Sequence, residues 1–451
     1  MKSALPKVLH RLGGQALLQH VLDTAAALQA ARTVVVTGHG AEQVEAAAAP
    51  SGALFARQLP QLGTGHAVLQ AAPLLDEANP TTLVLYGDVP LISVSSAQAL
   101  LQACDGQRLA LLSFTPEDTA RYGRIVRDAT GAVQAIVEYK DATPEERAIR
   151  EVYSGIMAAP TVALKRWVAA LRNDNTQHEY YLTDVVGLAV AEGLPVLALA
   201  TADETEVAGV NDAAQLATLE REFQSRLALR LMEEQGVRLA DPARLDVRGS
   251  LQCGADVEID VNCVFEGQVR LADGVRVGPN CVIRDADIGT GAVIHAFTHI
   301  EGARVGAGAL VGPYARLRPG AELGEEVHIG NFVEVKNSTL ARGAKANHLA
   351  YLGDATVGER VNFGAGSITA NYDGANKHRT VIGNDVQVGS NCVLIAPLKL
   401  GDGATIGGGS TLSKDAPAGQ LTVARARAVT LAAWTRPQKS APKVSGPREK
   451  P

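Results

Sequence analysis

The feature that most constrains this chain is an aliphatic residue at every sixth position through much of its C-terminal half. The step holds from Val305 to Val335 and resumes from Ile382 to Leu412. Neither a helix, with 3.6 residues per turn, nor a strand, with a period of two, keeps a six-residue phase. The period therefore predicts a solenoid in which each hexapeptide forms one flat face and sends one aliphatic side chain inward. With three repeats per triangular coil, residues 250–425 are expected to form roughly nine stacked coils.

Composition excludes several classes of protein. The 451 residues carry a formal net charge of -6 and give a pI of about 6.0, so there is no general attraction to nucleic acid or to anionic membranes. No run of eighteen apolar residues occurs, and the N-terminus has no apolar signal segment, so we expect a cytoplasmic protein without membrane insertion. The five cysteines are scattered without a C-x-x-C pair, which favours neither zinc nor a disulfide framework.

The first two hundred residues have a different texture, in which apolar runs alternate with helical segments rich in Ala and Leu. This alternation predicts an α/β domain with a mainly parallel sheet, in which ligands lie at the C-terminal ends of the strands. Strands are expected at residues 33–37, 81–86, 109–114, 135–139 and 195–200. Helices are expected at residues 17–30, 64–75, 97–103, 162–171 and 180–191.

A candidate metal ligand follows one of these strands. Residues 81–86 lead into Gly87-Asp88-Val89-Pro90, which presents the Asp88 carboxylate at the mouth of the expected crevice. A lone Asp after a strand also serves as a helix cap or a turn residue. A metal ligand and a structural residue are therefore both open interpretations of Asp88.

Two further stretches point to a phosphorylated ligand. Lys7 offers a cation near the start of the chain, and residues 61–66 open a helix with Gly63 and Gly65 in the turn. Backbone N–H groups at a helix N-terminus form a seat for an anion. Each signal is weak by itself, because a surface lysine and an ordinary loop fit the same residues.

The six-residue step fails between Ser367 and Ile382, where the polar, aromatic and basic segment 369–379 intervenes. An insertion of this kind in a solenoid is typical of a binding loop. Just upstream, adjoining repeats carry Arg316, Arg318, Lys336, Lys345, His348 and Tyr351. The cations suit a phosphate, and the histidine suits a general base near neutral pH, although an isolated histidine is more often a surface hydrogen-bonding group.

Eight motifs follow one another in order from residue 2 to about residue 436. They are Ser3-x-x-Pro6-Lys7-x-Leu9, Gln61-Leu62-Gly63-Thr64-Gly65-His66-Ala67, Tyr86-Gly87-Asp88-Val89-Pro90, Tyr122-Gly123-Arg124-Ile125, Glu138-x-Lys140-Asp141-Ala142, Arg316-Leu317-Arg318-Pro319-Gly320, Gly330-Asn331-Phe332-Val333-Glu334 and Asn371-Tyr372-Asp373-Gly374. In these motifs the chain resembles the bacterial bifunctional N-acetylglucosamine-1-phosphate uridyltransferases and glucosamine-1-phosphate N-acetyltransferases. The resemblance implies the last two steps to UDP-N-acetylglucosamine, a precursor of peptidoglycan and lipopolysaccharide.

The resemblance also implies a fold and a division into domains. The fold is an α/β Rossmann-like nucleotidyltransferase domain followed by a left-handed parallel β-helix, packed as a homotrimer with acetyltransferase sites at subunit contacts. An amphipathic stripe over residues 212–234 predicts the helix that connects the two domains. We expect a nucleotidyltransferase domain at 1–211, a linker helix at 212–235, a β-helix at 236–434 and a disordered tail at 435–451.

In the first domain, the resemblance assigns residues to the uridyl transfer from UTP. The implied nucleotide contacts are Lys7, Gln58, Gly63, Thr64 and Asp88. Gly123, Glu138 and Asn211 would contact the sugar phosphate, and Asp88 with Asn211 would also bind Mg²⁺.

In the solenoid, the resemblance assigns residues to the acetyl transfer from acetyl-CoA to glucosamine 1-phosphate. His348 would act as the general base. The implied sugar-phosphate contacts are Arg318, Lys336, Tyr351 and Asn362. The implied acetyl-CoA contacts are Ala365, Asn371, Tyr372, Ser390, Gly408 and Arg425.

Two departures from the family pattern lead to alternatives. Tyr153 stands where the family commonly has a sugar-contacting Asn. The family also opens with a strand and a glycine-rich L-x-x-G-x-G-T-R-M segment, and this segment is absent here. The leading interpretation is an enzyme with two active sites, and an acetyltransferase alone is the alternative function. We expect the chain as written to acetylate glucosamine 1-phosphate and to transfer uridylyl groups poorly or not at all. A nucleotidyltransferase with a purely regulatory solenoid is a third possibility, which the cluster of Arg318, Lys336 and His348 disfavours.

Overall fold

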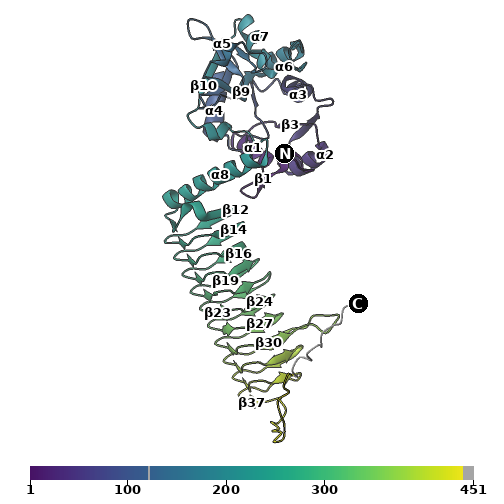
Figure 1. Ribbon diagram of the computed structural model, residues 1–451, viewed down its shortest axis with the longest axis vertical. Coiled ribbons are helices and arrows are strands. Elements are labelled where there is room, and N and C mark those ends of the chain that lie inside the picture. The colour runs from purple at the N-terminus through teal and green to yellow at the C-terminus, as the bar shows by residue number, and fades with distance from the viewer. Residues whose placement is uncertain (120–121, 440–451) are drawn as a thin grey trace, which may run out of the picture.

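The computed structural model describes residues 1–119 and 122–439 in two regions (Figure 1). An N-terminal α/β region is followed by α8 (Ala213–Glu234) and then by a long prism of short strands. The expected connector helix is present, and Asp212 begins it by accepting a hydrogen bond from the Gln215 N–H at 2.8 Å. Most of the tail expected from residue 435 lies outside the described residues.

The N-terminal region contains all five strands and all five helices that the sequence pattern predicts. Its strands are β1 (Arg11–Leu12), β2 (Gln15–Ala16), β3 (Val34–Thr37), β4 (Leu54–Arg57), β5 (Thr81–Val84), β6 (Leu109–Phe114), β7 (Arg124–Arg127), β8 (Val133–Val137), β9 (Val152–Pro160) and β10 (Val196–Ala200). Its α-helices are α1 (Leu17–Ala27), α2 (Ala41–Ala48), α3 (Thr64–Ala71), α4 (Val94–Cys104), α5 (Pro144–Arg147), α6 (Thr161–Ala170) and α7 (Val185–Ala191). Short 3₁₀ turns include η1 (Lys7–Leu9), η2 (Ala49–Ser51), η3 (Ala72–Leu74), η4 (Leu182–Asp184) and η5 (Glu204–Val207).

The main sheet differs from the expected parallel arrangement. Its order is β10-β6-β9-β7-β8, with β5 also paired to β9. Only β10 and β6 pair in parallel, whereas β9 runs antiparallel to β5, β6 and β7. The expectation of a mainly parallel sheet is therefore wrong for these strands. The nine residues of β9 form one nearly continuous buried run, whose direction no periodicity reveals.

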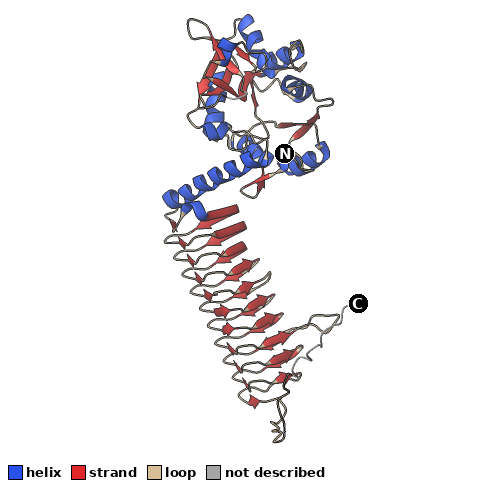
Figure 2. Cartoon of the chain, in the orientation of Figure 1, coloured by secondary structure: helices blue, strands red, loops and turns tan. Residues whose placement is uncertain are grey.

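The sheet is interrupted on its other side. β3 and β4 form a separate parallel pair, and a cavity of about 480 Å³ lies between β3 and β5. Apolar side chains of both strands line it, together with Leu22 and Ala25 of α1 and Val68 of α3. In Figure 2 the helices of the N-terminal region lie around its strands. The middle of the N-terminal region is therefore loosely filled.

The prism is a parallel β-helix built from stacked coils. One face contains β11 (Arg238–Leu239), β13 (Glu258–Ile259), β15 (Arg276–Val277), β17 (Val293–Ile294), β20 (Leu310–Val311), β23 (His328–Asn331), β26 (Lys345–His348), β29 (Asn362–Phe363), β32 (Gln387–Val388), β35 (Thr405–Ile406) and β37 (Leu421–Thr422). Ten of these eleven strands lie beyond residue 250, one more than the roughly nine coils expected from the repeat count.

Two further faces are joined at the first coils by three long strands. These are β12 (Leu245–Cys253), β14 (Cys263–Leu271) and β16 (Val282–Ile288). One face continues through β18 (His299–Glu301), β21 (Arg316–Leu317), β24 (Glu334–Lys336), β27 (Tyr351–Gly353), β30 (Ile368–Ala370), β33 (Val393–Ile395) and β36 (Thr411–Leu412). The other continues through β19 (Arg304–Val305), β22 (Glu322–Leu323), β25 (Thr339–Leu340), β28 (Ala355–Val357), β31 (Thr380–Ile382) and β34 (Leu398–Leu400).

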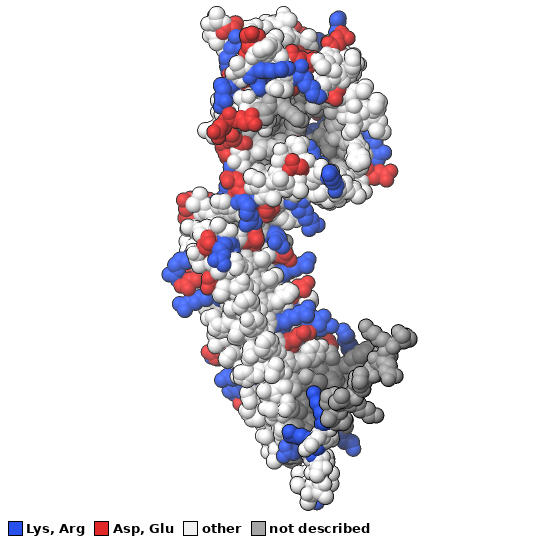
Figure 3. Space-filling model, viewed as in Figure 1, with Lys and Arg blue, Asp and Glu red and all other residues white. Residues whose placement is uncertain are grey.

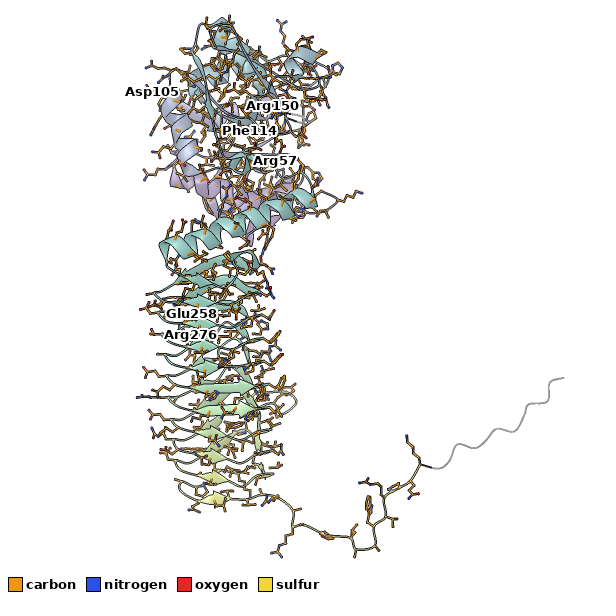
Figure 4. All side chains as sticks on the ribbon, turned by 60° about the vertical axis from the view of Figure 1, so that its left-hand side comes forward. Arg57, Asp105, Phe114, Arg150, Glu258 and Arg276 are labelled. Atoms are coloured by element: carbon orange, nitrogen blue, oxygen red, sulfur yellow. The ribbon has the colours of Figure 1, made fainter. Side chains whose placement is uncertain are left out.

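The side chains that recur at every sixth position point into this prism. The twelve aliphatic side chains from Val305 to Val335 and from Ile382 to Leu412 are all buried in one continuous core. Neighbouring coils pair in parallel, so that Glu258 stands beside Arg276, which is labelled with it in Figure 4. The predicted solenoid is confirmed, and its hexapeptide faces are consistent with a left-handed β-helix.

A small joint connects the two regions. The Gln224 side chain of α8 is buried and bonds both the N–H and the C=O of Val247, at 2.9 and 2.8 Å. The hairpin of β1 and β2 packs on the same helix, where the Gly13 N–H donates to Glu220 at 2.8 Å. Within the described residues, no helix is both long and apolar enough to cross a membrane.

Candidate functional sites

The first site begins where three chain segments meet at the edge of the N-terminal region. The Lys7 ammonium contacts the Asp88 carboxylate and donates to Asn211 Oδ1 at 3.0 Å. Asp88 follows β5, Asn211 precedes α8, and the Val210 N–H donates to the Asp88 carbonyl at 3.0 Å. The structure thus places two oxygen donors around one cation, although they are far apart in sequence.

The glycine turn before α3 is clamped by the segment before α7. Gly63 has a φ of +101°, and a Cβ there would lie 2.7 Å from the Tyr180 carbonyl, so only glycine fits. The Leu182 N–H donates to Thr64 Oγ1 at 3.1 Å, and the Gln58 amide donates to the Gly63 carbonyl at 2.8 Å. These contacts hold the N-terminus of α3 in a fixed position.

A second wall of this crevice carries Gly123 and Glu138. The Tyr153 N–H donates to the Gly123 carbonyl at 2.9 Å, and a Cβ on Gly123 would lie 3.7 Å from Glu138 Oε1. Thr183 Oγ1 donates to Glu138 Oε1 at 3.0 Å. Burial, with the nearby carboxylate of Asp184, raises the pKa of Glu138 above its ordinary value.

The side chain of Tyr153 is part of this wall of the crevice and does not extend into the crevice. Its side chain is buried, and its hydroxyl donates to the Gly155 carbonyl at 2.6 Å. Gly155 has a φ of +98°, and a Cβ there would lie 3.0 Å from the Tyr86 ring. Burial raises the pKa of Tyr86 to about 12, so this phenol stays neutral.

The second site lies on the β-helix, on the strands β21, β24 and β27. The Arg318 guanidinium donates to Glu334 Oε1 at 2.8 Å. The pKa of Lys336 is lowered by the adjacent Lys377 ammonium first and then by Arg318. Neither lysine has an ion pair within the described residues. Three cations held this close favour an anion between them.

Tyr351 stands beside these cations. Pairing of β24 with β27 places Lys336 beside Gly353. A Cβ on Gly353 would lie 2.3 Å from the Tyr351 hydroxyl, so the missing side chain makes room for this phenol. Asn362 is exposed on β29, where it pairs with Lys345.

His348 ends β26 at the neighbouring corner. Its Nδ1 lies 2.8 Å from Asn331 Oδ1, the residue beside it on β23. With Nδ1–H donating to this amide oxygen, Nε2 keeps its lone pair and faces solvent on an exposed side chain. The arrangement suits a general base.

Hydrogen bonds connect the corners of the successive coils that follow His348. The Gly366 N–H donates to the His348 carbonyl at 3.3 Å, and the Asn391 N–H donates to the Ala365 carbonyl at 2.8 Å. Further down, the Gly409 N–H donates to the Ser390 carbonyl at 2.8 Å. The last of these contacts is made by Arg425, whose Nη1 donates to the Gly408 carbonyl at 2.6 Å. The predicted coenzyme A residues Ala365, Ser390, Gly408 and Arg425 therefore form one column.

The inserted segment is a loop that leaves the prism between β30 and β31 (Figure 1). Asp373 fastens it internally by accepting from the N–H groups of Ala375 and Asn376, at 2.8 and 2.7 Å, and by contacting His378 Nε2 at 2.6 Å. These contacts hold the pKa of Asp373 well below its usual range. Tyr372, at the start of the loop, is 62% exposed.

An apolar row borders this site. Phe297, Tyr314, Phe332 and Leu349 occupy successive corners with positive φ, and each is between 47% and 60% exposed. The first three rings stack, with centroids 4.9 and 5.4 Å apart. In Figure 3 the face of the β-helix turned to the viewer is largely uncharged, with Lys and Arg gathered along its edges.

Sequence reasoning missed four residues that the geometry adds to the sites. They are Asn331, Glu334, Lys377 and Thr183. Asn331 and Glu334 lie inside the motif of residues 330–334, and Lys377 lies inside the predicted loop. The sequence therefore pointed to their positions but not to their contacts. Thr183, in η4, carried no signal, because its partner Glu138 lies far from it in the sequence, just after β8.

The comparisons with known proteins cover both regions. The model of the MobA-like NTP transferase domain matches residues 1–182, and the model of the bacterial transferase hexapeptide (six repeats) matches residues 302–337 and 379–414. A protein of Methylibium petroleiphilum is 71% identical over 97% of this chain and 96% of its own length. Those of Polaromonas naphthalenivorans and Bordetella parapertussis are 67% and 59% identical, each over 97% of this chain and over 95% and 96% of their own lengths.

All three relatives are named bifunctional protein GlmU. Among solved structures, a UDP-glucose pyrophosphorylase complexed with UDP-glucose is 15% identical, with a TM-score of 0.40 over 49% of this chain and 91% of its own.

Proposed function

The chain belongs to the family of the bifunctional protein GlmU, and from this premise we propose that it catalyses two transfers. An acetyl group passes from acetyl-CoA to glucosamine 1-phosphate, and then a uridylyl group passes from UTP to N-acetylglucosamine 1-phosphate, releasing pyrophosphate. The observation that carries the proposal is that the residues expected for each reaction gather in two separate clusters. One surrounds Lys7, and the other surrounds His348.

In the acetyl transfer, His348 Nε2 takes a proton from the sugar amine as the amine attacks the thioester carbonyl. A C–N bond forms, the C–S bond breaks, and coenzyme A leaves as the thiol after protonation. Asn331 holds the imidazole in the tautomer that leaves Nε2 free. Because this contact is made through Nδ1, it also fixes the direction in which the base points.

The acceptor sugar is held by its phosphate. Arg318, Lys336 and Lys377 supply positive charge on one side of the site, and Tyr351 and Asn362 offer hydrogen bonds to the sugar. The close approach of Lys336 and Lys377 costs free energy that a bound phosphate would recover, which supports an anion site here. Lys345, another of the cations noted in the sequence, lies on the same strand as His348.

Acetyl-CoA runs along the column of corners below His348. Ala365 and Ser390 lie along the path of the pantetheine arm, and Gly408 leaves room beside it, since it has no side chain. Asn371 and Tyr372 cover the path from the loop. Arg425 at the foot of the column supplies a cation for the coenzyme's phosphates.

In the uridyl transfer, an oxygen of the sugar 1-phosphate attacks the α-phosphorus of UTP, and the bond to pyrophosphate breaks. Gln58, Gly63 and Thr64 seat the nucleotide at the N-terminus of α3, and Lys7 contacts its phosphates. Gly123 and Glu138 hold the sugar on the opposite wall.

Asp88 and Asn211 fit Mg²⁺. Carboxylate and amide oxygens are ligands that this ion takes, usually with phosphates and water completing its shell. The Lys7 ammonium, which contacts both oxygens, is itself a cation held by this pair. When bound, the ion would neutralise charge on the phosphates.

The apolar row supports assembly into a homotrimer. The acetyl-transfer site of one chain is open, since His348 and Asn362 are exposed, and the row of Phe297, Tyr314, Phe332 and Leu349 adjoins it. An exposed apolar row of this length suits contact with another copy of the chain. Such a contact would close the site from the side.

The acetyltransferase acting alone is the less favoured alternative. The nucleotidyltransferase model matches residues 1–182, and relatives named bifunctional align over 97% of the chain. We therefore expect both activities in the same protein, in place of the poor uridyl transfer expected from the sequence.

The proposal is tested by separating the two activities. His348→Ala should lower acetyl transfer about 10²–10⁴-fold, the usual contribution of a general base, and leave uridyl transfer unchanged. Asp88→Asn should do the reverse, because loss of one charge weakens the metal and phosphate site. Coenzyme A release is followed with a thiol reagent, and pyrophosphate release over a Mg²⁺ titration.

Matched controls are available for both variants. His299→Ala removes an exposed histidine of the β-helix, and Asp105→Asn changes an exposed carboxylate at the end of α4. Both controls should keep both activities. Near-normal coenzyme A release by His348→Ala, or unchanged pyrophosphate release by Asp88→Asn, would contradict the corresponding half of the proposal.

A further inference from the structure

A buried carboxylate beside the acetyl-transfer site has no part in the chemistry described above. Asp354 follows β27, is 8% exposed, and has a φ of 49° at a corner of the coil. Charged side chains are seldom buried this far unless their hydrogen bonds are satisfied. Its contacts therefore indicate what the residue does.

Both carboxylate oxygens of Asp354 are engaged by amides from different segments. Oδ1 accepts from the Asn337 amide at 2.5 Å, and Oδ2 accepts from the amide of Asn371. Asn337 directly follows Lys336, and Asn371 is the first residue of the loop that leaves the prism. One carboxylate thus joins the phosphate-binding strand to the base of the loop.

The backbone of Asp354 makes the same connection. Its N–H donates to the Lys336 carbonyl at 3.1 Å, and its carbonyl accepts from the Thr380 N–H at 3.2 Å. Thr380 is the first residue after the loop. The two ends of the loop, at Asn371 and Thr380, are therefore both attached to one residue.

The charge of Asp354 matters as well as its shape. Lys336 is faced by Lys377 and Arg318, which lower its pKa, and by Asp354, which opposes that shift. Among the described groups that shift the pKa of Lys336, Asp354 is the one of opposite charge. Its carboxylate favours the charged form of a lysine that would hold the acceptor's phosphate.

We propose that Asp354 is a positioning residue for acetyl transfer, which fixes the loop of residues 371–379 to the strand of Lys336 and so holds the donor and acceptor sites in register. This role rests on the acetyl transfer proposed above. Because amides occupy both of its carboxylate oxygens, Asp354 acts through Asn371 and Lys336 and not on a substrate directly. It gives the loop a fixed base although the segment itself stands out from the prism.

The test is Asp354→Asn, which keeps the shape and removes the charge. An amide offers one acceptor where two donors must be met, so the loop loses one attachment. We expect the KM for both substrates to rise about tenfold, with a smaller loss of kcat. The basic limb of kcat/KM for glucosamine 1-phosphate should move to lower pH, because Lys336 loses its counter-charge and deprotonates sooner.

Two controls separate positioning from general damage. Asp385→Asn makes the same change at another corner with positive φ (58°), where the carboxylate pairs with Arg360 on the surface, and should leave both KM values as they were. Asn337→Gly suits its corner (φ 45°), removes one of the two donors, and should change KM in the same direction but less.

Hydrogen exchange provides a readout that does not depend on activity. In Asp354→Asn, exchange should quicken in residues 371–379 and stay slow in the coils on either side. Wild-type KM values and an unmoved pH profile would overturn the proposal, as would exchange that quickens through all coils. Failure of the acetyl transfer itself is detected separately, because His348→Ala would then show no defect.

Discussion

The two regions of this molecule hold their cores in opposite ways. In the β-helix, each inward aliphatic side chain packs on the coil above and the coil below, and one core continues from end to end. In the N-terminal region, the cores are divided among several clusters, and a cavity of about 480 Å³ separates β3 from β5. The β-helix is therefore filled by neighbours close in sequence, whereas the α/β region depends on segments that meet only in three dimensions.

The sites differ in the same way. The uridyl-transfer crevice collects single residues from strand ends and helix ends, with carboxylates such as Glu138 and Asp184 close together. The acetyl-transfer site is a column of corresponding corners, with cations close together instead. Three predictions on stability test how far this difference extends, in addition to the variants of His348, Asp88 and Asp354.

The largest effect is expected from truncating the β-helix core. Ile294 is fully buried on β17, so Ile294→Ala should cost about 2–5 kcal/mol in free energy of unfolding. Urea unfolding followed by hydrogen exchange in peptides from each region would measure it. Because coils interact mainly with their neighbours, protection should fall near residues 277–311 and persist in the N-terminal region. An equal loss of protection in both regions would contradict the separation of the cores.

An intermediate effect is expected when the same enlargement is made in both regions. Ala309→Leu inserts atoms into a fully buried position of the β-helix and should cost about 1–3 kcal/mol. Ala25 lines the cavity between β3 and β5. Ala25→Leu should therefore fill part of this cavity and stabilise the N-terminal region by about 0.5–2 kcal/mol. Ala26→Leu, on the exposed side of α1, is the control for helix propensity. Changes of the same sign at Ala309 and Ala25 would mean that the two regions are equally well filled.

The smallest effect concerns pH. The pKa of Glu138 is raised by burial, so its ionised form is less favourable in the folded than in the unfolded state. Glu138→Gln should therefore stabilise the N-terminal region near pH 7, by at most about 1 kcal/mol. This advantage should disappear as the pH falls below 4.5, where the carboxyl is protonated in both states. An advantage that persists at low pH, measured by urea unfolding, would exclude burial of the charge as its cause.

Much of the fold was accessible from sequence because it depends on local period. The six-residue step identified the inward side chains from Val305 to Val335 and from Ile382 to Leu412. The alternation of apolar and helical segments located five strands and five helices of the N-terminal region. The direction of β9 was not accessible, since a strand buried along nearly its whole length can pair either way until its neighbours are placed.

The sequence by itself determined which residue types stand at each repeat, and hence the column from His348 to Arg425, because a solenoid converts spacing directly into position. Only the tertiary structure decided which polar groups meet across segments. Asn331 beside His348, Lys377 beside Lys336 and Asp354 at the base of the loop are contacts between coils or across an insertion. The physical reason is that the period fixes which side chains point inward, whereas hydrogen-bond partners on the outside depend on corner geometry and on where an irregular loop returns.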